Sequence, residues 1–154
     1  MEPLPERIFT VEEADALVSV MAEVMAEVGR LTARVQERTT QIQVLDVLWG
    51  PKVRQPHNPD HREYREHETA VGRAVERIEG LIRDEILARG VRFPPGGLEH
   101  GLLDFPTTLD GRVVFLSWRL WETGVGHWHE IDGGFAGRRP VTPDLARRMG
   151  VESG

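Results

Sequence analysis

The chain has 154 residues, of which 29% are charged and 40% hydrophobic, with a formal net charge of −6 at pH 7. This length fits one domain, and the acidic balance argues against non-specific nucleic-acid binding. The absence of cysteine excludes disulfides, thiolate metal sites and cysteine nucleophiles. No apolar run approaches the roughly 20 residues that span a bilayer, and the first residues lack the pattern of a signal peptide. We therefore expect a cytoplasmic protein with neither a nucleic-acid nor a membrane partner.

A long helix is predicted over residues 10–49. Thr10 followed three positions later by Glu13 is a capping-box pattern, which is typical of a helix start. Beyond it the apolar residues recur with a seven-residue period over about five heptads, and Arg38 is the one charged interruption. This seam predicts a coiled-coil-like helix. Its residues are Ala14, Leu17, Met21, Val24, Val28, Leu31, Val35, Ile42, Leu45 and Trp49.

A second helix is predicted over residues 60–89. Residues 50–59 contain three prolines and a glycine and predict a loop, while Gly90 fits a helix C-cap. Two long helices joined by a short loop form an antiparallel hairpin. We expect this hairpin to form a homodimer, because one apolar stripe needs a covering surface. The histidines of this region, which we expect to be solvated, are His57, His61 and His67.

Residues 91–140 predict a small antiparallel sheet, because short β-rich runs alternate with Gly, Pro and Asp-Gly. Asp110-Gly111 is expected to form the turn between the first two strands. The tail, 141–154, predicts a short helix over 143–149. The expected fold is a single α+β domain, residues 1–154, in which a long antiparallel hairpin packs with about three strands. The strands are expected near 100–105, 112–119 and 126–131.

The stretch GHWHEIDGG holds a His-x-His pair, His127 and His129. Alternation along a strand places both imidazoles on one face, where they could chelate a divalent transition metal. Glu122 is the nearest carboxylate that could complete the ligand set, and Asp104 or His100 could reach from across the sheet. The alternative is a pair of hydrogen-bonded or solvated histidines with no metal.

A glycine-rich turn follows over residues 132–137, next to Arg138 and Arg139. Its backbone N–H groups could form an anion-binding nest, with the arginines forking onto a carboxylate or phosphate. The alternative is a structural turn in which Asp132 caps local N–H groups and Arg138 pairs with an acid.

Three tryptophans, Trp118, Trp121 and Trp128, lie within eleven positions, with Phe115 and Phe135 beside them. Such a cluster could line a pocket for a small molecule. The alternative is that it forms the core between the sheet and the helices.

Four stretches together resemble a family of uncharacterised bacterial proteins, domain of unknown function 2203. They are FTVEEADAL, GLLDFP, GRVVFLSWRLWE and WHEIDGGFAGRRP. The resemblance covers nearly the whole chain and implies no known activity. The positions that match the family pattern are Asp104, Trp118, Arg119, Glu122, Trp128, His129, Asp132, Phe135, Gly137 and Arg138.

Two positions depart from the family pattern. Ser117 stands where the family often has cysteine, and Trp121 stands where it usually has glycine. His127 is not part of the family pattern. The resemblance therefore favours a site built on His129 with Glu122 and Asp132 over a metal site built on the His-x-His pair.

These residues support three hypotheses about function. The first is a dimeric binding or accessory protein in which Arg138 holds a small anionic ligand, with Arg119, Trp118 and Trp128 as further ligand-binding residues. The second is an enzyme that uses His129 as a general base or metal ligand. The third is a purely structural or oligomerisation module. In the binding-protein hypothesis the polar pocket consists of Glu122, His129, Asp132 and Arg138. In the enzyme hypothesis Glu122 or Asp132 orients the imidazole of His129.

Overall fold

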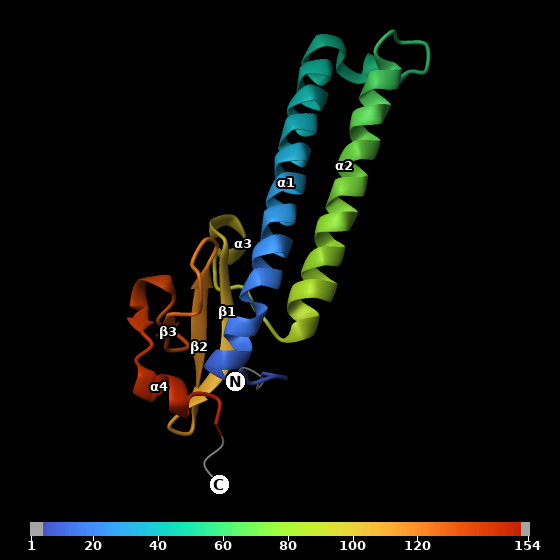
Figure 1. Ribbon diagram of the computed structural model, residues 1–154. Coiled ribbons are helices and arrows are strands. Elements are labelled where there is room, and N and C mark those ends of the chain that lie inside the picture. The colour runs from blue at the N-terminus through green and yellow to red at the C-terminus, as the bar shows by residue number, and fades with distance from the viewer. Residues whose placement is uncertain (1–4, 152–154) are drawn as a thin grey trace. The chain divides into compact units, whose positions relative to one another are not determined.

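A computed structural model describes residues 5–151 (Figure 1). The chain divides into two compact units. One joins the residues up to Met25 with those from Arg83 onward, and the other comprises Ala26–Ile82. The fold is α+β, with two long helices and an antiparallel sheet. None of the described helices is long and apolar enough to cross a membrane.

Helix α1, Val11–Trp49, begins where the capping box predicts. The backbone N–H of Thr10 donates to Glu13 Oε1 over 3.0 Å, and the N–H of Glu13 donates to Thr10 Oγ1 over 3.1 Å. This reciprocal pair satisfies two N–H groups that a helix start leaves open. The buried members of the predicted seam are Ala14, Met21, Val24, Val28, Leu31 and Leu45.

The second unit is a helical hairpin built from the later part of α1 and helix α2, His61–Leu81 (Figure 1). A short 3-10 helix, Gly50–Arg54, lies within the predicted loop. Near it Leu45, Val53 and Tyr64 form a small core with Ile42 and Trp49 packed against it. The indole N–H of Trp49 also donates to Asp60 over 2.7 Å, which ties the end of α1 to the start of α2.

The predicted second helix changes type before it ends. The α-helical part ends at Leu81, Ile82–Ile86 is a π-helical turn, and Leu87–Arg89 is a 3-10 turn. A π-helical turn shifts the register of the side chains, and Ile86 within it is fully buried. The helical stretch stops at Gly90, whose φ of 89° is the left-handed conformation of a glycine C-cap.

The other unit contains a sheet of four antiparallel strands in the order β1-β2-β3-β4, so the expected number of three is corrected. The strands are β1 Leu102–Leu109, β2 Arg112–Arg119, β3 His127–His129 and β4 Arg139–Pro140. Asp110 and Gly111 both have positive φ, as the two-residue turn between β1 and β2 requires. The sequence did not predict β4, because two residues carry no alternation pattern and Pro140 argues against a strand.

The boundaries of two further strands also differ from the expected ones. The first strand was expected to start near residue 100, but that residue ends the short helix α3, Gly97–His100. Strand β1 starts at Leu102 and runs four residues beyond the expected end. Strand β3 ends at His129, because the chain turns at residues 131–134. The expected short C-terminal helix is present as α4, Pro143–Arg148, and Thr142 caps it.

The sheet has two chemically different faces. Phe105, Leu116 and Trp128 lie side by side on one face, as the strand register shows. Phe9 packs edge-on against Phe105 at 5.3 Å between ring centroids, and the backbone N–H of Val125 donates to Asp15 of α1. The apolar face is therefore the core side of this unit, and the opposite face carries polar residues.

Candidate functional site

The polar face of the sheet gathers residues from three strands and one turn. Asp104 on β1 pairs with Ser117 on β2, and Ser117 pairs with His127 on β3. Asp104, Ser117 and His129 are all buried. We call the set Asp104, Ser117, Glu122, His129 and Arg138 the polar layer, because hydrogen bonds connect its members in two groups described below.

His129 is hydrogen-bonded through both ring nitrogens. Its Nε2 lies 3.0 Å from Asp104 Oδ1, and its Nδ1 lies 2.7 Å from the carbonyl oxygen of Glu130. Both partners are acceptors, so the geometry favours the imidazolium, which carries a proton on each nitrogen. Burial acts to lower the pKa of His129, but the hydrogen bond and charge of Asp104 outweigh it and raise that pKa above its usual value.

Glu122 and Arg138 form the second group. Arg138 Nη2 donates to Glu122 Oε1 over 2.6 Å, and its Nε donates to Ser117 Oγ over 3.0 Å. The same Glu122 oxygen accepts from the backbone N–H of Arg119. Burial acts to raise the pKa of Glu122, but the hydrogen bonds from Arg138 and Arg119 outweigh it and hold that pKa below its usual value. Arg138 therefore joins β2, the turn after it and the chain before β4.

The two departures from the family pattern have different consequences here. The hydroxyl of Ser117 accepts the hydrogen bond from Arg138, so this position contributes to the contact that holds residue 138. Trp121 has a φ of 86°, a conformation that favours glycine, and its side chain is 85% exposed. The glycine of the family pattern is thus what the backbone at this position requires.

The glycine-rich turn closes over the polar face. Phe135–Gly137 forms a 3-10 turn, and the ring of Phe135 lies 4.8 Å from the guanidinium carbon of Arg138. A Cβ on Gly133 would lie 3.4 Å from the backbone of Glu130. These contacts support the interpretation of this segment as a structural turn, with Arg138 paired to an acid.

Several predicted site residues are not brought together. Asp132 is exposed and does not contact His129 through any recorded hydrogen bond or ion pair. Trp118 and Trp128 are buried on the apolar face, which supports the core interpretation of the aromatic cluster. Arg119 is exposed, with its guanidinium 5.7 Å from the Phe135 ring. The predicted ligand-binding residues thus lie on both faces of the sheet.

The predicted metal ligands do not form a ligand group. His127 Nδ1 lies 3.7 Å from Glu122 Oε2, while His129 directs its nitrogens to Asp104 and Glu130. Within residues 5–151 no three His, Asp or Glu side chains are grouped so that they could hold a metal ion.

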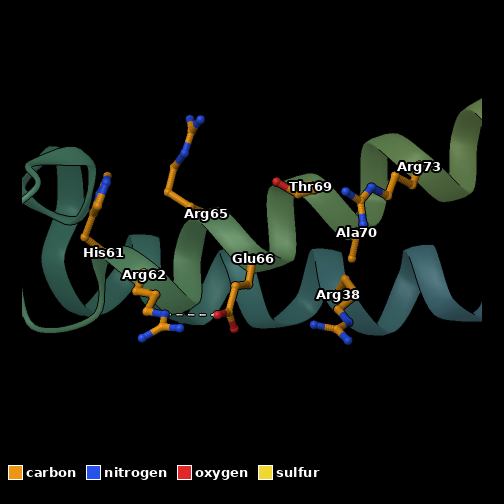
Figure 2. A pocket seen from close by; sticks show the side chains of 8 residues that line it. All are labelled: Arg38, His61, Arg62, Arg65, Glu66, Thr69, Ala70 and Arg73. Atoms are coloured by element: carbon orange, nitrogen blue, oxygen red, sulfur yellow. Dashed lines mark ion pairs between the residues drawn. The ribbon is translucent and has the colours of Figure 1, made fainter.

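Sequence reasoning missed a polar groove on the hairpin. Its volume is about 620 Å³, and most of its lining comes from one face of α2 (Figure 2). We call it the arginine groove. The signal in the sequence was the spacing of arginines along α2 together with Arg38, the charged interruption of the seam. The lining residues are Arg38, His61, Arg62, Arg65, Glu66, Thr69, Ala70 and Arg73.

His67 lies beside this groove and corrects an expectation. It is buried, not solvated, and its Nδ1 lies 3.1 Å from Arg38 Nη1. A guanidinium only donates, so Nδ1 is the acceptor and the proton of a neutral ring is on Nε2, which lies 3.5 Å from Glu63. The charged interruption in α1 is thus explained by a polar partner on α2.

The fold and the polar layer define a small α+β protein with a closed hydrogen-bonded network on one sheet face and a basic groove on its hairpin. Residues 7–141 match the family described as uncharacterised conserved protein, DUF2203, and the chain belongs to this family. No curated protein and no solved structure matches the chain.

Proposed function

We propose that this protein is a non-catalytic binding protein in which the sheet unit is a scaffold and the helical hairpin carries the binding surface. The observation that carries the proposal is a contrast between two arginines. Arg138 is 12% exposed and is hydrogen-bonded to Ser117 and Glu122. Arg73 lines an open groove and makes no recorded ion pair within the described part of the chain. Of these two arginines, the one accessible to a ligand is on the hairpin.

The state of His129 supports a non-catalytic reading. A general base needs a free nitrogen within hydrogen-bond reach of its substrate, and a metal ligand needs a nitrogen lone pair. In His129 both nitrogens face acceptors of the protein, and the residue is 2% exposed. The enzyme hypothesis would require the glycine-rich turn and Asp104 to move away first.

A stability measurement tests the scaffold part of the proposal. Residues of a functional site commonly cost stability, so their removal is neutral or stabilising. A scaffold contact behaves in the opposite way, because its loss leaves a buried partner unpaired. We expect Arg138→Met to lower the free energy of unfolding by about 2–3 kcal/mol, measured by urea denaturation.

The matched control is Arg112→Met, which removes the exposed ion pair of Arg112 with Glu130. An exposed pair contributes little to stability, so the control should unfold almost as the wild type does. If Arg138→Met is as stable as the wild type or more so, the polar layer is not a scaffold. That result would favour the enzyme hypothesis.

The homodimer is part of the proposal. Val44, Val47 and Leu48 are exposed on the last turns of α1, and clustered exposed apolar side chains mark association surfaces. We infer that two copies of the chain associate through these turns. The surface lies on the hairpin, where the dimer was expected, but beside the apolar seam, because Leu45 of the seam is buried within the hairpin.

A further inference from the structure

The arginine groove concentrates positive charge on an acidic chain. Four guanidinium groups and one carboxylate, that of Glu66, line it, whereas the whole chain has a net charge of −6. Figure 2 shows Arg38 on α1 opposite Ala70 on α2, with Arg73 one turn further along. Because arginine forks onto planar anions such as carboxylates, the groove has the chemistry of an anion-binding surface.

The arginines of α2 follow one face of that helix. Arg62, Arg65 and Arg73, with Thr69 between the last two, are spaced by three or four positions, which places them on the same face. From Arg62 to Arg73 the face extends about 16 Å at 1.5 Å per residue. This shape is elongated, so it fits several anionic groups in a row better than a single compact anion.

The cations of the groove are only partly neutralised. Arg62 lies 3.4 Å from Glu66, and Arg65 lies 3.5 Å from Glu68. Both are exposed i,i+4 or i,i+3 pairs, which contribute little and can exchange partners. Arg73 makes no recorded ion pair in the described residues and is ready to accept a partner.

We propose that the arginine groove binds a carboxylate-rich segment of a partner polypeptide, an inference that rests on the proposed binding function. Glu66 within the groove repels a continuous phosphate backbone, whereas separate carboxylates can face the arginines and avoid it. The small side chain of Ala70 and the aliphatic stems of the arginines offer apolar surface to the methylenes of such carboxylates.

Fluorescence anisotropy with a labelled twelve-residue oligoglutamate tests this proposal on the full chain. The groove variant is Arg62→Gln with Arg73→Gln. The matched control is Arg83→Gln with Arg147→Gln, which makes the same charge change at exposed arginines outside the groove that pair with acids of their own helical segments. Circular dichroism checks that each variant retains its helices.

We expect the wild type and the control to bind the peptide and the groove variant to bind it on the order of tenfold more weakly. Binding should weaken as salt is raised from about 0.05 M to 0.5 M, because the contacts are exposed. No binding by the wild type, or equal loss in both variants, overturns the assignment to the groove. Tighter binding of a single-stranded oligonucleotide of equal charge overturns the partner chemistry.

This result is separable from the proposed function as a whole. Failure of the peptide to bind while Arg138→Met is destabilised rejects the acidic partner and retains the scaffold. If Arg138→Met and the wild type have the same free energy of unfolding, the scaffold role is rejected, whether or not the peptide binds.

Discussion

His129 on β3 contacts Asp104 on β1 across the intervening strand β2, with 3.0 Å between Nε2 and Oδ1. Neighbouring strands lie about 4.8 Å apart, so the two backbones are separated by about 10 Å. The two side chains bridge this gap over Phe115, whose ring lies 5.5 Å from the imidazole. The buried pair therefore connects the short strand β3 to strand β1, which is not its neighbour in the sheet.

The stability of the protein should depend on pH through His129. Because its pKa is raised in the folded state, protonated His129 stabilises the fold. This contribution is complete below the unfolded pKa of about 6.5 and is lost as the pH rises through the folded pKa. We expect the free energy of unfolding to fall over that range, measured by urea denaturation at a series of pH values.

Two variants isolate this effect. In His129→Gln the part of the pH dependence due to His129 should disappear, and in Asp104→Asn the NMR titration midpoint of His129 should move down. A midpoint at or below about 6.5 in the wild type would contradict the raised pKa.

Trp121→Gly should stabilise the protein. Trp121 holds a φ of 86° with a side chain that is 85% exposed, and backbone strain of this kind costs about 1–3 kcal/mol. Glycine removes the strain but adds freedom to the unfolded chain, so we expect a net gain of about 0.5–1 kcal/mol in thermal or urea denaturation. Trp121→Ala keeps the Cβ and should show no such gain. Equal stability of the two variants would mean that the backbone is not strained there.

Thr10→Ala should destabilise the start of α1. The substitution removes the hydroxyl that accepts from the backbone N–H of Glu13, and loss of an N-cap costs about 1 kcal/mol. Thr10→Ser retains the hydroxyl and serves as the control. A loss of similar size in both variants would point to the methyl group of Thr10 instead of its hydrogen bond.

The dimer should depend on the last turns of α1. Val47 is 89% exposed and Leu48 lies beside it, so glutamates at both positions should place charge in the association surface. We expect the wild type to sediment as a dimer and Val47→Glu with Leu48→Glu as a monomer. Leu98→Glu, at an exposed leucine outside the hairpin, should leave the dimer intact. A monomeric wild type at micromolar concentration would refute the dimer.

Part of the candidate site could be predicted from the sequence. The resemblance to the family marked Asp104, Glu122, His129 and Arg138, and these residues do lie in one polar layer. The partners were predicted less well. Glu122 or Asp132 was expected to orient His129, whereas Asp104 does so, because the pairing of β1 with β2 and of β2 with β3 sets which carboxylate comes within reach. The sequence suggested an open polar pocket around His129 and Arg138, but in the structure these two side chains are largely buried. Their burial could not be predicted, because it depends on how the chain folds back to form β4.

Features that depend on near neighbours in the chain could be derived from sequence patterns. The start of α1 at Thr10, the turn at Asp110-Gly111 and the C-cap at Gly90 each follow from a local rule about hydrogen bonds or φ. Three features depend on contacts formed only in the folded chain: the two-residue strand β4, the bridge from His129 to Asp104, and the partner of Arg38. The physical reason is that these contacts join residues far apart in the chain, and their energies depend on strand register and on the path of the backbone, which no local pattern encodes.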